Sequence, residues 1–249
     1  MTRRVEVLGV RIDPVDRAAL LRAVDGFVDD HARDGRTRVV AYANVHVLNT
    51  ACRDERLRTF LNHADLCYCD GNGVVLGARW LGQHLPERMT GADWIWDLAA
   101  ICEGRRKIFW LGGRPGVAAM AALKLRERFP RLRVDTEHGF HDHYGSVVRR
   151  VNESGAHVLL VGMGTPVQEH WLSRHLPALR VPVAWVTGAT ADFVSGAVSR
   201  GPAWLHQDYE WLARLVTEPR RLWKRYLLGN AAFALRVARE RYSRSTSDL

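Results

Sequence analysis

Residues 157–169 read HVLLVGMGTPVQE, and this stretch decides the fold that we predict for the chain. Residues 158–161 are apolar at every position instead of every second one, which is typical of a strand covered by helices on both faces. Thr165 and Pro166 then suit a helix start, because threonine can cap it and proline fits its first turn. A buried strand that leads into a helix is the repeating unit of a parallel sheet.

The same alternation recurs along the chain. An opening strand at 5–10 precedes a helix for which Asp13 is the expected N-cap and Pro14 the first position. Further strands are predicted at 38–43, 65–69, 107–111, 132–135, 157–161 and 183–186, and helices at 54–63, 73–81, 92–103, 115–129, 144–153 and 166–175. We therefore predict an α/β fold with a mostly parallel, Rossmann-like sheet flanked by helices.

The size and composition fit one large core with an addition at its end. Of 249 residues, 47% are hydrophobic and 25% charged. We predict an α/β core at 1–200, a basic helical appendage at 201–249, and a disordered tail after about residue 243. No stretch approaches the roughly 20 apolar residues of a membrane-spanning helix, and the first residues lack the apolar region of a signal peptide. We expect a cytosolic protein.

The net charge of +9 is concentrated near the end of the chain. Between Trp211 and Arg244, nine Lys or Arg stand against Glu218 and Glu240. Such a segment, with aromatic residues between its charges, could serve nucleic acid, an anionic membrane or a polyphosphate ligand. It could also be a solvated helix face.

Polar residues follow the predicted strands, where ligands bind in open parallel sheets. Tyr42 and Asn44 lie at the end of the strand at 38–43, and Asp70 begins the sequence DGNG after the next strand. A carboxylate beside glycines could act as a general base on a substrate hydroxyl, or it could cap the helix that follows.

Three later loops carry candidates with alternatives of the same kind. Gly112 and Gly113 could let backbone N–H groups hold a phosphate, or they could form a tight turn. Arg88 could bind a phosphate or pair with Glu87 or Asp93. Gln168 lies near a helix start and has no structural purpose evident from the sequence, whereas Glu169 could complement the helix dipole.

Metal, disulfide and cofactor chemistry are not predicted. The four cysteines lack CxxC spacing and read as reduced, partly buried thiols. The histidines of HGFHDH, residues 138–143, have no carboxylate partner set in the sequence, and no Asp-x-Asp pair is present. Arg, Lys and backbone dipoles would then have to neutralise any diphosphate.

Seven segments in order make the chain similar to the WecG/TagA/CpsF glycosyltransferase family. They are ANVHVLNTACRDERLRTFLNHADLCYCDGNGVVLGAR, LPERMTGAD, IFWLGGRPGVA, EHGF, LLVGMGTPVQEHW, TGATADFVSGAVSRGPAW and EWLARLVTEPRRLWKRYLLGN. The resemblance runs from about residue 5 to residue 229. Tyr42 replaces the family's usual Thr, Val167 its usual Lys, and Gly201 a common Ala.

The resemblance implies roles for the residues that match. Asp70 looks like the catalytic base. Asn44, Arg88 and Gln168 match residues expected to position donor and acceptor, and the substrate-binding set is Tyr42, Asn44, Arg88, Asp93, Gly112, Gly113, Gln168, Arg214, Arg221 and Arg225. The last three arginines look like those that close over the UDP diphosphate, and the basic appendage that carries them is expected to close the active site and to contact the membrane.

The resemblance also implies a function. It is an inverting, metal-independent transfer from a UDP-sugar, with N-acetylmannosamine favoured, to a sugar linked to undecaprenyl diphosphate for cell-surface polysaccharide or teichoic-acid-type synthesis. The expected partners are this donor, this acceptor and the anionic inner face of the membrane. Nucleic acid is not an expected partner, and a homo-oligomer is possible. The alternatives are UDP-glucose or UDP-N-acetylmannosaminuronic acid as donor, a nucleotide-dependent oxidoreductase, or a binding module without catalysis.

Overall fold

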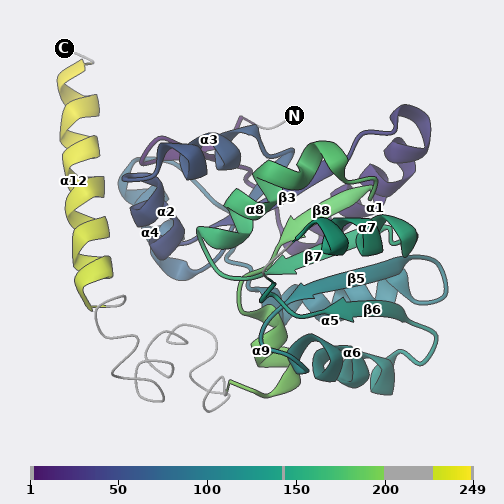
Figure 1. The fold of residues 1–249 in the computed structure, drawn as a ribbon. Coiled ribbons are helices and arrows are strands. Elements are labelled where there is room, and N and C mark those ends of the chain that lie inside the picture. The colour runs from purple at the N-terminus through teal and green to yellow at the C-terminus, as the bar shows by residue number, and fades with distance from the viewer. Residues whose placement is uncertain (1–2, 142–143, 199–226, 248–249) are drawn as a thin grey trace.

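The computed structural model describes residues 3–141, 144–198 and 227–247, and the structure below refers to these residues. A parallel sheet of six strands in the order β4-β3-β8-β7-β5-β6 forms its centre (Figure 1). The strands are β3 Arg38–Ala43, β4 Leu66–Cys69, β5 Lys107–Gly112, β6 Arg133–Glu137, β7 Val158–Gly162 and β8 Val183–Val186. The predicted parallel α/β sheet is confirmed, because each neighbouring pair runs parallel.

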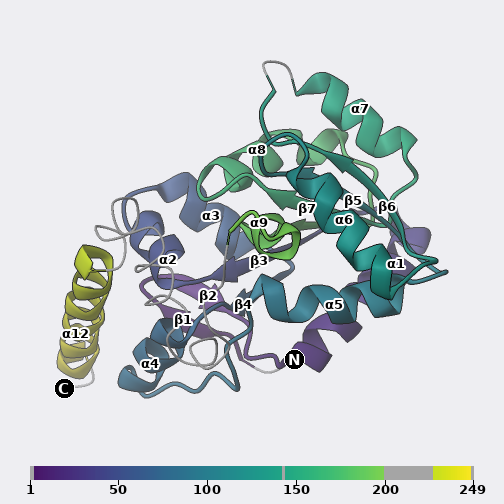
Figure 2. The ribbon, with the colours of Figure 1, turned by 90° about the horizontal axis from the view of Figure 1, so that it is seen from below.

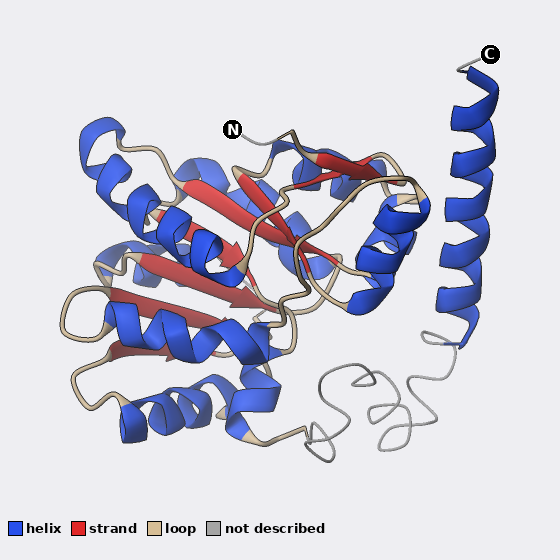
Figure 3. Cartoon of the chain, turned by 180° about the vertical axis from the view of Figure 1, so that it is seen from behind, coloured by secondary structure: helices blue, strands red, loops and turns tan. Residues whose placement is uncertain are grey.

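Helices cover both faces of this sheet, as the view from behind shows (Figure 3). They are α1 Arg17–Asp34, α2 Val45–Ala51, α3 Glu55–His63, α4 Asn72–Trp80, α5 Gly91–Cys102, α6 Val117–Arg128, α7 Gly145–Glu153, α8 Val167–His175, α9 Thr190–Ser195 and α12 Gly229–Ser247, with a short 3-10 turn at Leu176–Ala178. Seen from below, α5, α6 and α9 lie over one face (Figure 2), and α3 packs with α8 over the other.

Buried aromatic rings fix the layers between the strands and α5. Trp94 of α5 stacks on Trp185 of β8 with ring centroids 3.9 Å apart, and its indole N–H donates to the Tyr68 hydroxyl at 3.0 Å. All three side chains are at most 1% exposed. The cysteines of the described chain are free, and Cys67, Cys69 and Cys102 are buried, as expected for reduced thiols.

The beginning of the chain differs from the prediction in two ways. A strand at 5–10 is wrong, because Leu8 and Gly9 adopt positive φ and turn the chain into a hairpin of β1 Val5–Val7 and β2 Val10–Ile12. Asp13 is also not the cap of α1: its carboxylate accepts from Arg4 and from the Cys67 backbone N–H, and Asp16 caps the helix.

The end of the chain forms a helix beyond the predicted limit. The sequence predicted disorder after about residue 243, whereas α12 continues to Ser247. An ion pair between Arg244 and Glu240, one helical turn apart, and a bond from Arg244 to the Glu6 carbonyl stabilise this last part. In the described residues, no helix combines the length and apolarity needed to cross a membrane.

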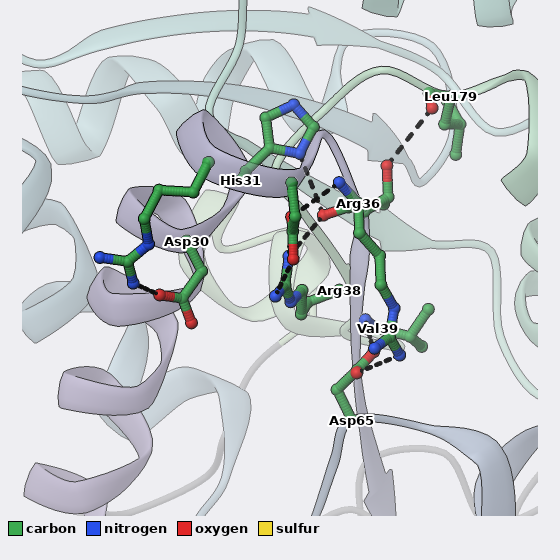
Figure 4. Close-up of polar contacts among 10 residues, drawn as sticks. Asp30, His31, Arg36, Arg38, Val39, Asp65 and Leu179 are labelled. Atoms are coloured by element: carbon green, nitrogen blue, oxygen red, sulfur yellow. Dashed lines mark hydrogen bonds and ion pairs between the residues drawn. The ribbon is translucent and has the colours of Figure 1, made fainter.

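Ion pairs hold the amino ends of the strands together. Asp65, just before β4, accepts from the Arg36 guanidinium at 2.6 Å and from the Val39 backbone N–H at 2.8 Å (Figure 4). Asp34 binds Arg38 through both oxygens at 2.7 Å, and these bonds hold the pKa of Asp34 below its usual value. These charged side chains therefore connect neighbouring elements of the fold.

Candidate active site

A cavity of about 1920 Å³ lies at the carboxyl ends of the strands. Residues that follow all six strands line it, namely Asn44 after β3, Asp70 after β4, Gly113 after β5, Gly139 after β6, Gly164 after β7 and Gly188 after β8. This is the place where ligands bind in parallel α/β folds. Of the predicted site residues within the described chain, Tyr42, Asn44, Asp70, Arg88 and Gly113 line it.

Asn44 connects the ends of two neighbouring strands. Its side-chain oxygen accepts from the Val47 backbone N–H at 2.9 Å and caps α2, while its amide donates to Asp70 at 3.0 Å. Gly71, and not Asp70, stands at the N-cap position of α4. The Asp70 side chain lines the cavity instead of holding that position.

Gln168 is fully buried and is not among the residues that line the cavity. Its carbonyl accepts from the Gly188 backbone N–H at 3.0 Å, and its amide donates to the Tyr42 hydroxyl at 3.3 Å and to Glu169 at 2.8 Å. Gln168 thus joins α8 to the ends of β3 and β8. The sequence placed it at the ligand side, but the structure shows it behind the wall, where it orients Tyr42.

Glu169 is a buried carboxyl that the sequence analysis assigned to the helix dipole. It lies in the first turn of α8, is 0% exposed, and accepts from Thr165 and Gln168 through Oε1, each at 2.8 Å. Its Oε2 is buried without a hydrogen-bond partner among the described residues. Burial raises the pKa of the Glu169 carboxyl. Burial also raises the pKa of the Tyr42 hydroxyl, and the nearby Glu169 raises it further.

Arg88 reaches the cavity from the turn between α4 and α5. Its guanidinium lies 3.7 Å from Asp93, which also accepts from the Thr90 hydroxyl at 2.6 Å. Arg88 and Thr90 line the cavity, whereas Asp93 does not. Of the two carboxylates considered as partners, Asp93 pairs with Arg88, and Glu87 accepts instead from the Arg17 backbone N–H. Asp93 therefore contributes to the site by pairing with Arg88 and does not itself line the cavity.

The glycine loop after β5 packs closely against β7. A Cβ on Gly112 would lie 2.3 Å from the Gly162 carbonyl oxygen, and the Gly113 N–H donates to that same oxygen at 3.0 Å. Gly113 has a φ of 68°, which favours glycine. This N–H already has a partner in the protein, so the tight-turn alternative describes these two glycines best.

A group of His and Glu side chains lies at the end of β6, and one of them, His141, lines the cavity. The ligand atoms of Glu137, His138 and His141 lie within 4.8 Å of one another, although the sequence analysis counted no carboxylate with these histidines. Each has a protein partner: Arg150 lies 2.5 Å from Glu137, the His138 ring accepts from the Phe140 N–H, and His141 contacts the His138 carbonyl. The arrangement is compatible with a cation, and equally with a folded loop.

Helix α12, which belongs to the basic appendage, supplies a wall of the cavity whose residues the sequence analysis did not name. Phe233, Ala234 and Val237 line the cavity, and Phe233 and Val237 are at most 6% exposed. Their spacing of one helical turn was a usable signal, but the basic charge of the segment obscured it. Arg214, Arg221 and Arg225 lie outside the described residues.

Comparisons with known proteins found a matching family model and similar relatives. A family model described as "Glycosyl transferase WecG/TagA/CpsF family" matches residues 5–247. Similar relatives are the N-acetylglucosaminyldiphosphoundecaprenol N-acetyl-beta-D-mannosaminyltransferases of Staphylococcus aureus strains NCTC 8325 / PS 47 and COL. Each is 26% identical over 227 residues, which cover 90% of this chain and 87% of the relative.

Proposed function

The chain belongs to the WecG/TagA/CpsF family of glycosyl transferases, and from this premise we propose that it transfers N-acetylmannosamine from a UDP-sugar to N-acetylglucosamine linked to undecaprenyl diphosphate. The relatives are named for this sugar and this acceptor. The observation that carries the proposal is the placing of Asp70 at the cavity wall with its carboxylate held by Asn44. This geometry suits a general base.

Asp70 removes the proton from the acceptor hydroxyl as that oxygen attacks the anomeric carbon of the donor. The new bond joins acceptor oxygen to sugar carbon, the bond from that carbon to the diphosphate breaks, and UDP leaves with the electron pair. One displacement of this kind inverts the configuration, so a UDP-α-sugar gives a β-linked product. The bond from Asn44 keeps the Asp70 carboxylate in a fixed position.

Positive side chains stabilise the diphosphate as it leaves, without a metal ion. Arg88 and Arg114 line the cavity from two sides, and Asp93 orients Arg88. A guanidinium group held in position, as that of Arg88 is by Asp93, is effective at such a task. From the family resemblance we assign Arg214, Arg221 and Arg225 to the same diphosphate.

The remaining predicted residues shape the site at different depths. Tyr42 lines the cavity beside Thr165 and bears on the choice of sugar, since the family usually has the smaller Thr there. Gln168 fixes Tyr42 and Gly188 from behind, and Gly112 permits the close approach of β5 to β7. UDP-glucose and UDP-N-acetylmannosaminuronic acid are the alternative donors, because this tyrosine changes the pocket.

The enzyme works at the inner face of the membrane, where the lipid-linked acceptor is anchored. Helix α12 carries Arg236, Arg239, Arg241 and Arg244, and it exposes Leu235 and Tyr242 to solvent. Cationic residues near an anionic leaflet each contribute about 1 kcal/mol, and aromatic side chains favour the interface. An appendage that contacts the membrane and closes the site, and a homo-oligomer, stay predictions from the resemblance.

A donor panel tests this function. The wild-type chain is mixed with a short-chain polyprenyl-diphosphate N-acetylglucosamine acceptor and with each of UDP-N-acetylmannosamine, UDP-glucose and UDP-N-acetylmannosaminuronic acid. Mass spectrometry follows the disaccharide lipid. We expect transfer to be fastest from UDP-N-acetylmannosamine. A faster reaction with another donor would replace the sugar in the proposal, and no transfer from any donor would refute it.

A further inference from the structure

The cavity changes in character between the sheet and the helices that flank it. At the strand ends its wall is polar, with Asn44 and Asp70, whereas α4 and α12 form an apolar wall. The apolar residues of this wall are Val75, Leu76, Trp80, Phe233, Ala234 and Val237. A site for two sugars and a diphosphate does not itself require such a wall, so this surface suits a further, apolar group.

Two large side chains of α4 are exposed although they border the cavity. Leu76 is 60% exposed and Trp80 52% exposed, and they lie one helical turn apart on the same side of α4. Both side chains remain in contact with water and with the cavity at once. An exposed apolar surface that continues into a binding cavity marks a place for an apolar ligand or partner.

Helix α12 is held in place as the second wall. The Gly229 carbonyl accepts from Asn49 at 2.7 Å, and Glu240 accepts from the Leu8 backbone N–H at 2.9 Å. Gly77 lets the helices approach, because a Cβ there would lie 2.7 Å from the Phe233 ring. Figures 1 and 2 both place α12 along α2 and α4, in agreement with the contacts between these helices. These contacts therefore hold α12 in a defined position beside α4.

We propose that Leu76 and Trp80, with Phe233 beside them, bind the first isoprenoid units of the acceptor lipid where it leaves the cavity. This inference rests on the proposed function, because the relatives are named for an acceptor joined through diphosphate to a polyprenol. The acceptor sugar lies at Asp70, so its lipid must leave the cavity over an apolar surface. Arg79 lines the cavity between Leu76 and Trp80 in sequence, which places a cation near the junction of diphosphate and lipid.

The chemistry of the wall favours a lipid chain over the alternatives. The surface continues into the reaction cavity, as a substrate tail requires, whereas a contact with the bilayer surface or with a second copy of the chain requires no such continuity. A tryptophan at the rim suits a boundary between apolar lipid and water. We therefore commit to the acceptor's own polyprenyl chain.

The test compares two acceptors that differ only in their tail. One carries N-acetylglucosamine diphosphate on a short polyprenyl chain and the other carries the same group on methyl. For the double variant Leu76→Ser/Trp80→Ser, the preference in kcat/KM for the polyprenyl acceptor should fall about tenfold or more, since two apolar contacts are lost. The matched control, Met120→Ser/Leu123→Ser, changes side chains of α6 that are 47% and 52% exposed and do not line the cavity. It should keep the wild-type preference.

The outcomes separate this inference from the proposed function. An unchanged preference in the Leu76/Trp80 variant overturns the inference, and so does an equal loss in the control. If that variant keeps its preference but loses binding to anionic phospholipid vesicles, the wall is a bilayer contact. If it keeps its preference and changes its sedimentation coefficient, the wall is a contact between copies. When the wild type transfers to neither acceptor, the proposed function itself has failed.

Discussion

Two aspartates stand at opposite ends of β4 and have opposite surroundings. Asp65 precedes the strand, and its two oxygens accept from Arg36 at 2.6 Å and from the Val39 N–H at 2.8 Å. Asp70 follows the strand, lines a cavity of about 1920 Å³ and is held by the Asn44 amide. The residue type is the same, but one carboxylate joins elements and the other faces a space large enough for substrates.

The same contrast runs along the whole sheet. At the amino ends, Lys107 pairs with Asp135 at 2.7 Å and Arg106 with Asp29 at 2.5 Å, so charge is used to join neighbouring elements. At the carboxyl ends, polar and glycine residues from all six strands line the cavity. Substitutions at the amino ends of the strands should therefore change stability, and substitutions at the carboxyl ends should change the rate of transfer.

The largest expected effect comes from exchanging each of these aspartates for asparagine. Asp70→Asn should lower turnover by about 100-fold or more, because general-base catalysis contributes about that much, with little change in Tm. Asp65→Asn should cost about 1–3 kcal/mol of unfolding free energy, because a charge-assisted bond is lost, while turnover by the folded protein persists. Denaturant unfolding and UDP release measure the two quantities. Equal losses of turnover in both variants would contradict the contrast.

The next effect concerns the bond that orients Asp70. Asn44→Ser keeps a good helix cap for α2 but removes the amide donor, so turnover should fall about tenfold with stability nearly retained. Asn44→Ala removes the cap as well and should cost about 1 kcal/mol more stability. Steady-state kinetics and thermal unfolding distinguish these outcomes. If the serine variant matched the wild type in turnover, Asn44 would be a cap and no more.

A smaller effect concerns the dependence of stability on pH, which should have opposite signs for Glu169 near the carboxyl ends of the strands and for Asp34 near their amino ends. Burial raises the pKa of the Glu169 carboxyl above its ordinary value of 4.5, so folding favours its protonated form. The stability of the protein therefore falls as pH rises from 4.5 through the raised pKa. Asp34, whose pKa is lowered from 3.8, contributes stability that is lost as pH falls. Glu169→Gln should therefore gain stability relative to the wild type at pH 7 compared with pH 3, whereas Asp34→Asn should lose it, because the Asp34 contribution disappears only below pH 3.8. Unfolding curves at both pH values check the signs.

The smallest expected effect is that of removing metal ions. Arginines at the cavity are proposed to replace a divalent cation, so EDTA should leave the transfer rate unchanged. The cluster of Glu137, His138 and His141 is the part of the described chain most able to hold an ion. A rate that fell with EDTA and returned with Mg²⁺ or Zn²⁺ would reject metal independence and point to that cluster.

Much of the sheet could be predicted because most of its strands, β6 excepted, are apolar at nearly every position. The predicted strands at 38–43 and 183–186 have the same bounds as β3 and β8, and the others shift by a residue or two. The short helices α2 and α9 were missed, because seven and six residues are too few to show a helical period. The opening hairpin was missed because Leu8, an unusual residue at positive φ, forms its turn with Gly9.

The site could be predicted in its residues more than in their depth. Asp70 and Asn44 follow neighbouring strands, so their order in the sequence already brings them to one edge. The burial of Gln168 could not be foreseen, because it depends on Tyr42 from β3 and Gly188 after β8, which only the folded sheet brings together. Family membership then decided for a transferase over the oxidoreductase and binding-module alternatives, which composition alone had left open.

The most direct test of the account is the dependence of UDP release on acceptor, together with the configuration of the product. The wild-type chain is supplied with UDP-N-acetylmannosamine, with and without the polyprenyl-diphosphate acceptor, and the disaccharide linkage is read by NMR. A single displacement assisted by Asp70 predicts UDP release that requires the acceptor, and a β-linkage. UDP release at the same rate without acceptor, or an α-linked product, would contradict it.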